Sequence, residues 1–312
     1  MVVVVARTDK KPSRHVSTTP KRVHLAVPPS NPHQHASKIA ESVDRAWYPA
    51  HGTSTLEIPL SVIAALSLLT PPEHQCDEVA MHLLTLDPPT FATLMRTQWA
   101  IFINYRPDLV NRAWPLIEVW YHNRHLDEQK LTAAKKVADE AIRAGQLHLT
   151  GTDRRRQTDL FGTVLTTLRA PSAASARGQF YTPAPMADTI ARLVGAPAEG
   201  DQIMEPAAGT GGLLCAAAEA MRDLGRDPTT VEWYAVDIDY LTIACLAVNT
   251  VLWELGEKVI LGVGNGLTDE WLTQAIAERR ETIELAHNIR RNKLMLHALR
   301  SAEVLIQKTD RV

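Results

Sequence analysis

The feature that most limits the fold of this chain is an alternation of short and long apolar segments in its second half. Residues 202–206, 231–239 and 258–264 are short and largely apolar, which predicts strands. Residues 211–225 and 240–256 lie between them and repeat apolar side chains at helical spacing. The order strand, helix, strand, helix, strand predicts a parallel sheet of the α/β class.

The first half of the chain predicts helices instead. Its successive segments repeat apolar residues three and four positions apart, and Pro-Pro pairs at 71–72 and 88–89 separate them. After residue 268 the sequence again predicts a helix, and we find no fourth strand. We therefore expect a disordered basic tail (1–37), a helical domain (38–168), an α/β half-domain (169–268) and a C-terminal helical extension (269–312).

Composition excludes several classes of protein. Lys and Arg number 33 against 35 Asp and Glu, so any surface for nucleic acid has to be local, as in the basic tail. The longest apolar run, residues 58–69, is too short to span a bilayer, and the opening MVVVVA is too short for a signal peptide. The three cysteines form no CxxC pair, and the histidines show no ligand spacing, so we expect no metal site. A cytoplasmic protein without membrane contact is the expectation.

The strongest local motif is the segment 204–212, Met-Glu-Pro-Ala-Ala-Gly-Thr-Gly-Gly, which follows the first strand and opens a helix. Glycines allow a sharp turn and a close approach of backbone to ligand, and the helix beyond them offers free N–H groups. The spacing matches neither a phosphate loop nor a dinucleotide fingerprint. Glu205 would repel a pyrophosphate but suits a zwitterionic or cationic ligand.

Two further polar residues follow strands. Asp237 ends the second strand, where α/β nucleotide folds place an acid against the ribose hydroxyls. Asn265 follows the third strand in a Gly-Asn-Gly turn, from which its amide could meet an adenine edge. A loop for an amino acid, an acid for a ribose and an amide for a base together indicate S-adenosylmethionine.

These segments resemble the N6-adenine DNA methyltransferases, most closely the modification (M) subunits of type I restriction-modification systems. Residues 178–183, GQFYTP, are similar to the motif that precedes their first strand, and residues 205–212 to their first motif, usually written with Asp in place of Glu205. The segment 235–239 is similar to their ribose-binding strand. Residues 264–267 are similar to their Gly-Asp-Ser/Thr-Leu, with Asn265 in the place of Asp. The resemblance covers about residues 160–268.

The resemblance implies a Rossmann-like S-adenosylmethionine-binding methyltransferase domain, DNA as substrate and a protein partner that supplies target recognition or the catalytic loop. It implies that these residues bind the cofactor: Phe180, Tyr181, Thr182, Glu205, Pro206, Gly209, Thr210, Gly211, Asp237, Ile238 and Asn265. Simpler alternatives remain open for some of them. The glycines could form an ordinary turn, Asp237 could cap a helix, and Phe180 and Tyr181 could pack in the core.

The chain departs from the family at its catalytic motif. In the family, a fourth strand ends in Asn/Asp-Pro-Pro-Tyr/Phe, which holds the flipped adenine, and no such tetrapeptide follows Leu267. The nearest match is Asp87-Pro88-Pro89-Thr90, where Thr replaces the aromatic ring and a helix cap is the main alternative. The catalytic residues are therefore unknown, and the α/β domain is predicted to be truncated or incomplete.

Two functions remain open on this basis. The first is an N6-adenine DNA methyltransferase whose catalytic loop comes from a diverged segment or a partner chain. The second is a catalytically inactive, cofactor-binding regulatory or DNA-associated subunit. Methylation of a small molecule or a protein has less support, because GQFYTP is typical of the DNA enzymes.

Overall fold

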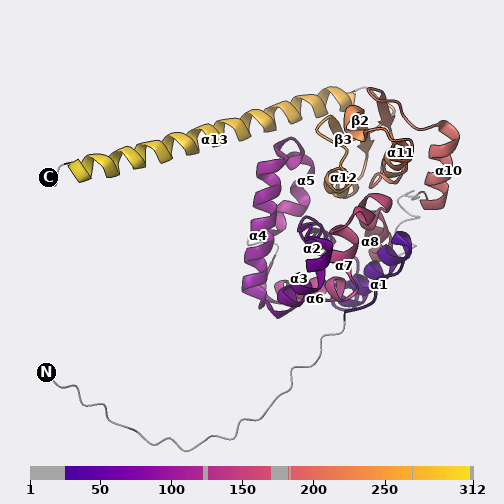
Figure 1. The fold of residues 1–312 in the computed structure, drawn as a ribbon, viewed down its shortest axis with the longest axis horizontal. Helices are drawn as coiled ribbons and strands as arrows, with labels where there is room; N and C mark the ends of the chain where they lie inside the picture. Colours follow the sequence, from indigo (N-terminus) through magenta and orange to yellow (C-terminus); the bar gives the residue numbers. More distant parts are fainter. Residues whose placement is uncertain (1–24, 122–125, 170–181, 183, 269, 310–312) are drawn as a thin grey trace, which may run out of the picture.

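The structure is a computed structural model that describes residues 25–121, 126–169, 182, 184–268 and 270–309. A group of packed helices lies beside a small α/β unit, and one long helix extends away from both (Figure 1). The mostly helical α/β class predicted from the sequence is confirmed.

The helical part is built from eight α-helices and four short 3-10 turns among the described residues. They are α1 (Pro32–His51), α2 (Glu57–Ser67), η1 (Glu73–Gln75), α3 (Cys76–Thr85), α4 (Pro88–Tyr105), η2 (Pro107–Leu109), α5 (Val110–Ile117), η3 (Glu118–Trp120), α6 (Glu128–Arg143), α7 (Gln146–Thr150), η4 (Asp153–Gln157) and α8 (Leu160–Leu168). Helix α2 is buried on every side from Ile58 to Ser67, as its nearly continuous apolar sequence requires. Its Ser61 hydroxyl accepts the indole N–H groups of Trp99 and Trp120 at 3.0 and 2.8 Å.

Helix α1 begins at Pro32, inside the segment 1–37 that we expect to be a tail. The Asn31 side chain accepts the N–H groups of His33 and Gln34 at 2.9 and 3.1 Å. Proline suits the first helical position because the N–H group it lacks would have no partner there. The helix-start signal at Asn31 and Pro32 therefore determines the structure of residues 31–37, and the prediction that the tail extends to residue 37 is wrong. Residues 1–24 of the expected tail lie outside the described residues.

The α/β unit holds the three strands predicted from the sequence. Its elements are α10 (Ala184–Val194), β1 (Gln202–Glu205), α11 (Gly212–Asp223), η5 (Pro228–Thr230), β2 (Glu232–Asp237), α12 (Tyr240–Leu252) and β3 (Val259–Val263). The described strands are parallel and lie in the order β1-β2-β3. Met204 pairs with Tyr234, which pairs with Ile260. Their carboxyl ends therefore share one edge of the sheet.

The helical part and the α/β unit share one hydrophobic core. Helix α12 is buried from Leu241 to Thr250 and packs on one side against the sheet and on the other against α2, α5 and α8. Polar contacts reinforce this junction: Arg112 of α5 donates to the carbonyl of Leu261 in β3 at 2.8 Å. The carboxyl ends of the strands are thereby fixed relative to α8.

Helix α13 (Glu270–Thr309) begins on the sheet and then leaves the body of the protein (Figure 1). Trp271 and Ala275 in its first turns are buried together with Val236 of β2. Farther along, Leu285 and Ile289 are exposed. In the part of the chain that the structure describes, no helix combines the length and apolar character needed to cross a membrane.

The three cysteines are buried, as expected from their apolar surroundings in the sequence, and none of them forms a disulfide.

Candidate functional site

The loops that follow β1, β2 and β3 meet at Asp237. Its Oδ2 accepts the N–H of Gly209 at 2.8 Å, and its Oδ1 accepts the N–H of Asp239 at 2.9 Å. Its backbone carbonyl accepts the N–H of Gly264 from the loop after β3 at 3.0 Å. The predicted ribose acid and the predicted glycine-rich loop are therefore in direct contact.

The glycine-rich loop has the backbone geometry that its sequence predicts. Gly209 and Gly211 have φ values of 54° and 95°, in the left-handed region that favours glycine. Gly211 caps α11, and a Cβ atom there would overlap Leu246 and lie 2.9 Å from the Trp253 ring. Only glycine fits this turn, because both its conformation and its neighbours exclude a side chain.

The loop after β3 lies against the loop after β1. A Cβ atom at Gly266 would overlap the carbonyl oxygen of Pro206, so these two backbones approach closely. Asn265 is exposed, and its Oδ1 accepts the N–H of Leu267 at 3.0 Å. Ile238, with 80% of its surface exposed, also faces solvent at this edge.

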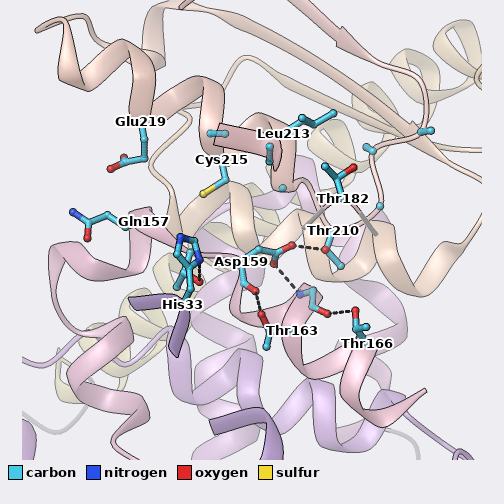
Figure 2. A pocket seen from close by; sticks show the side chains of 18 of the residues that line it. His33, Gln157, Asp159, Thr163, Thr166, Thr182, Thr210, Leu213, Cys215 and Glu219 are labelled. Carbon is cyan, nitrogen blue, oxygen red and sulfur yellow. Dashed lines mark hydrogen bonds between the residues drawn. The ribbon is translucent and has the colours of Figure 1, made fainter. Parts of the chain in front are cut away.

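A cavity of about 380 Å³, within the usual range of small-molecule sites, opens on the other side of the glycine-rich loop. Its walls are the loop itself, α8, α10 and α11, with Thr182 at one end (Figure 2). Figure 2 shows Thr163 and Thr166 of α8 on one side and Leu213 and Cys215 of α11 on the other. The lining combines hydroxyl groups with small apolar side chains.

The predicted site residues divide between these two places. Thr182, Gly209 and Thr210 line the cavity, and Gly209 also contacts Asp237. The others that are described do not line the cavity. Gly211 caps α11, and five lie at the strand ends: Glu205, Pro206, Asp237, Ile238 and Asn265. Phe180 and Tyr181 lie outside the described residues. The glycine-rich loop thus borders both the cavity and the strand ends.

Asp159 is a site residue that the sequence reasoning missed. It caps α8 by accepting the N–H of Gly162 at 2.8 Å, and it also accepts the Thr210 hydroxyl at 2.5 Å (Figure 2). The Asn249 amide donates to Asp159 at 2.9 Å. Burial raises the pKa of the Asp159 carboxyl, while these hydrogen bonds oppose the rise. The only signal in the sequence is that of a cap, because an acid there precedes an apolar helix.

A buried ion pair holds the end of α8 next to the start of α12. The guanidinium of Arg169 lies 2.6 Å from Asp239 Oδ2, and the two side chains are 5% and 10% exposed. Asp239 also caps α12 by accepting the N–H of Leu241 at 2.9 Å. This ion pair fixes the position of Asp239, which lies two residues after the end of β2.

The upstream Asp-Pro-Pro-Thr sequence is a helix cap. Asp87 accepts the N–H of Thr90 at 2.7 Å and begins α4. This hydrogen bond lowers the pKa of the Asp87 carboxyl. Of the two interpretations of this tetrapeptide, the cap is confirmed.

No group of three or more His, Cys, Asp or Glu side chains is placed to hold a metal ion within the described ranges.

The model of a known protein family matches the region that contains the strand ends and most of the residues that line the cavity. Residues 156–287 match the family model described as N-6 DNA Methylase. This N-6 methylase region runs from the residues just before Asp159 into α13 and includes the whole sheet. The resemblance to this family that the motifs indicate is thereby confirmed over these residues.

One similar solved structure is the methyltransferase subunit of a type I restriction-modification system from Streptococcus thermophilus. The two chains are 16% identical, with a TM-score of 0.42, over 76% of this chain and 60% of that one. The present chain therefore matches about three-fifths of the length of that subunit. None of the curated proteins matches this chain.

Proposed function

We propose that residues 156–287 form the cofactor-binding part of an S-adenosylmethionine-dependent N6-adenine DNA methyltransferase of the type I modification kind. The hydrogen bond from Gly209 to Asp237 is the observation that carries this proposal. It places the glycine-rich loop next to the ribose acid, and the cofactor needs both of them in one site. The family match over the same residues supports it.

The residues at the strand ends suit this cofactor. Each carboxylate oxygen of Asp237 accepts one backbone N–H, which leaves a lone pair on each for the ribose hydroxyls. Glu205, half-buried at the end of β1, adds negative charge that favours a cationic sulfonium compound. Asn265 is exposed beside the same edge, where its amide would face the adenine.

The cavity side suits the amino-acid end of the molecule. Thr182 and the backbone of Gly209 and Thr210 line a space that is closed by α8 and α11. The N-terminus of α11 faces this loop, and free N–H groups at a helix start favour a carboxylate. S-adenosylmethionine supplies an activated methyl group; this chain's own residues bind it and set its orientation.

Binding of the target adenine requires a segment in addition to the cofactor-binding residues described above. Within the described residues, β1 pairs only with β2, so its other edge is open beside the glycine-rich loop. Asp87 caps α4 and has no part in this edge. We infer that a protein partner, or a part of the chain outside the described residues, supplies the catalytic loop and target recognition there. A DNA-modifying protein of this kind acts in the cytoplasm, the location that we propose.

A catalytically inactive, cofactor-binding subunit is the second candidate. This candidate needs no catalytic tetrapeptide, and residues 268–312 contain no Asn/Asp-Pro-Pro-aromatic sequence. Such a subunit would bind S-adenosylmethionine and associate with DNA or with an active methyltransferase.

Calorimetric titration with S-adenosylmethionine tests the binding step. We expect binding by the full chain and a large loss of affinity in Asp237→Ala. The variant Asp127→Ala, which removes an exposed cap of α6, is the matched control and should bind normally. Absence of binding by the unaltered chain would refute both candidates.

Methyl transfer from labelled S-adenosylmethionine to adenine-containing DNA distinguishes the two candidates. The assay is run with this chain alone and with the products of neighbouring genes. Transfer in any combination supports the methyltransferase, provided that Asp237→Ala abolishes it. Cofactor binding without transfer in every combination supports the inactive subunit.

A further inference from the structure

A half-buried carboxylate, Asp159, lies where the helical part meets the glycine-rich loop. Asp159 is half-buried in the wall of the cavity, and none of the ion pairs among the described residues includes it. Burying a charged group is costly unless hydrogen bonds compensate for it. Asp87 and Asp127 also cap helices, and their side chains are exposed. Capping α8 alone does not require Asp159 to lie against Thr210 and Asn249.

The compensation comes from the glycine-rich loop and α12. The Thr210 hydroxyl donates to Asp159 Oδ2 at 2.5 Å, and the Asn249 amide donates to Asp159 Oδ1 at 2.9 Å. The same Asn249 nitrogen donates to the carbonyl oxygen of Thr210 at 2.8 Å. Thr210 is therefore held at both its side chain and its backbone.

Thr210 stands between the two glycines that shape the loop. Gly209 on one side donates to Asp237, and Gly211 on the other begins α11 in a left-handed conformation. Because adjacent glycines offer little stiffness of their own, the position of Thr210 sets the direction of the Gly209 N–H. The hydrogen bonds thus run from Asp159 through Thr210 and Gly209 to Asp237.

The packing around this network leaves little freedom. A Cβ atom at Gly162 would overlap Asp159 Oδ2 and lie 2.6 Å from the Thr210 hydroxyl. Figure 2 shows Asp159 and Thr210 facing each other in the wall of the cavity. The start of α8 is therefore in close contact with the loop.

We infer that Asp159 is a positioning residue, which acts through Thr210 to hold the glycine-rich loop in the conformation that binds S-adenosylmethionine. This inference rests on the proposed function for its ligand. It assigns to the helical part an effect on cofactor affinity, transmitted through Thr210 and Gly209 to the ribose acid Asp237.

Isothermal titration with S-adenosylmethionine is the first test. We expect Thr210→Val to weaken binding about tenfold, equivalent to about 1.4 kcal/mol, and Thr210→Ser to bind within twofold of the unaltered chain. Asp159→Ala should weaken binding at least as much as Thr210→Val. The double variant should bind no more weakly than Asp159→Ala alone, because both changes remove one interaction. Asp127→Ala, a cap loss in the same helical part, should leave the affinity unchanged.

Hydrogen exchange of the ligand-free chain is the second test, and it does not depend on the ligand. Amides of residues 207–211 should exchange faster in Asp159→Ala and Thr210→Val than in Asp127→Ala and Thr210→Ser. If the unaltered chain fails to bind S-adenosylmethionine, the proposed function is wrong, and the exchange result alone decides whether Asp159 holds the loop.

Three results would overturn the inference. One is normal affinity in a folded Thr210→Val, which serves where Asp159→Ala does not fold. Another is additive loss of affinity in the double variant. The third is loop exchange that is unchanged in both single variants.

Discussion

Replacing Gly211 by alanine tests whether the glycine-rich loop has the shape described above. Gly211 has φ 95°, and a Cβ atom there would overlap Leu246 and lie 2.9 Å from Trp253. The neighbouring Gly212 offers a matched control, because it is the first residue of α11 and a Cβ atom there meets nothing within 4 Å. The two substitutions add the same methyl group one residue apart.

The expected cost of Gly211→Ala has two parts. A left-handed backbone costs a non-glycine residue about 1–2 kcal/mol, and overfilling a packed core costs about 1–3 kcal/mol. Together they lower the free energy of unfolding by about 3 kcal/mol. With a denaturant slope of about 3 kcal/mol/M, the urea midpoint should fall by about 1 M. Gly212→Ala should instead gain about 0.5–1 kcal/mol, because alanine loses less entropy in a helix.

Urea unfolding followed by tryptophan fluorescence measures both variants, since Trp253 lies against the loop. Equal midpoints for Gly211→Ala and Gly212→Ala would refute the turn geometry. A lowered midpoint for Gly212→Ala alone would place the tight turn one residue later.

Three further changes test other parts of the structure. Arg169→Met should lower the free energy of unfolding by about 3–5 kcal/mol in urea titrations, since it removes one partner of a buried ion pair. Ser61→Ala should cost about 2 kcal/mol, because two buried indole N–H groups lose their acceptor; unchanged thermal unfolding would contradict this. Burial lowers the pKa of His35 to about 4, below its unfolded value of 6.5. The folded state therefore binds this proton less readily, and stability should fall as the pH drops from 6.5 to 4; His35→Gln should flatten this slope, and a parallel pH curve would argue against it.

The sequence predicted the parts of the fold that depend on local pattern. The three strands are where their apolar segments predict them, and the turn at Gly209 and Gly211 has the left-handed geometry that glycine allows. Asp237 was predicted at a strand end, and it is there. These features could be predicted because each depends on neighbouring residues.

The missed features depend on contacts between distant residues. Asp159 precedes Thr210 by 51 positions and Asn249 by 90, so no pattern in the sequence joins them. The cavity could not be predicted for the same reason, since one wall is α8 of the helical part. The start of α1 is different: Asn31 and Pro32 carry a clear cap signal, which the surrounding composition obscured.

The burial of α12 bears on how this protein can change during evolution. Its side chains from Leu241 to Thr250 fill the space between the sheet and α2, α5 and α8. A recombination event that joined the helical part of one relative to the α/β unit of another would bring together surfaces that had not adapted to each other. We therefore expect the two parts to be inherited as a single module, with exchange between relatives confined to positions outside this shared interior.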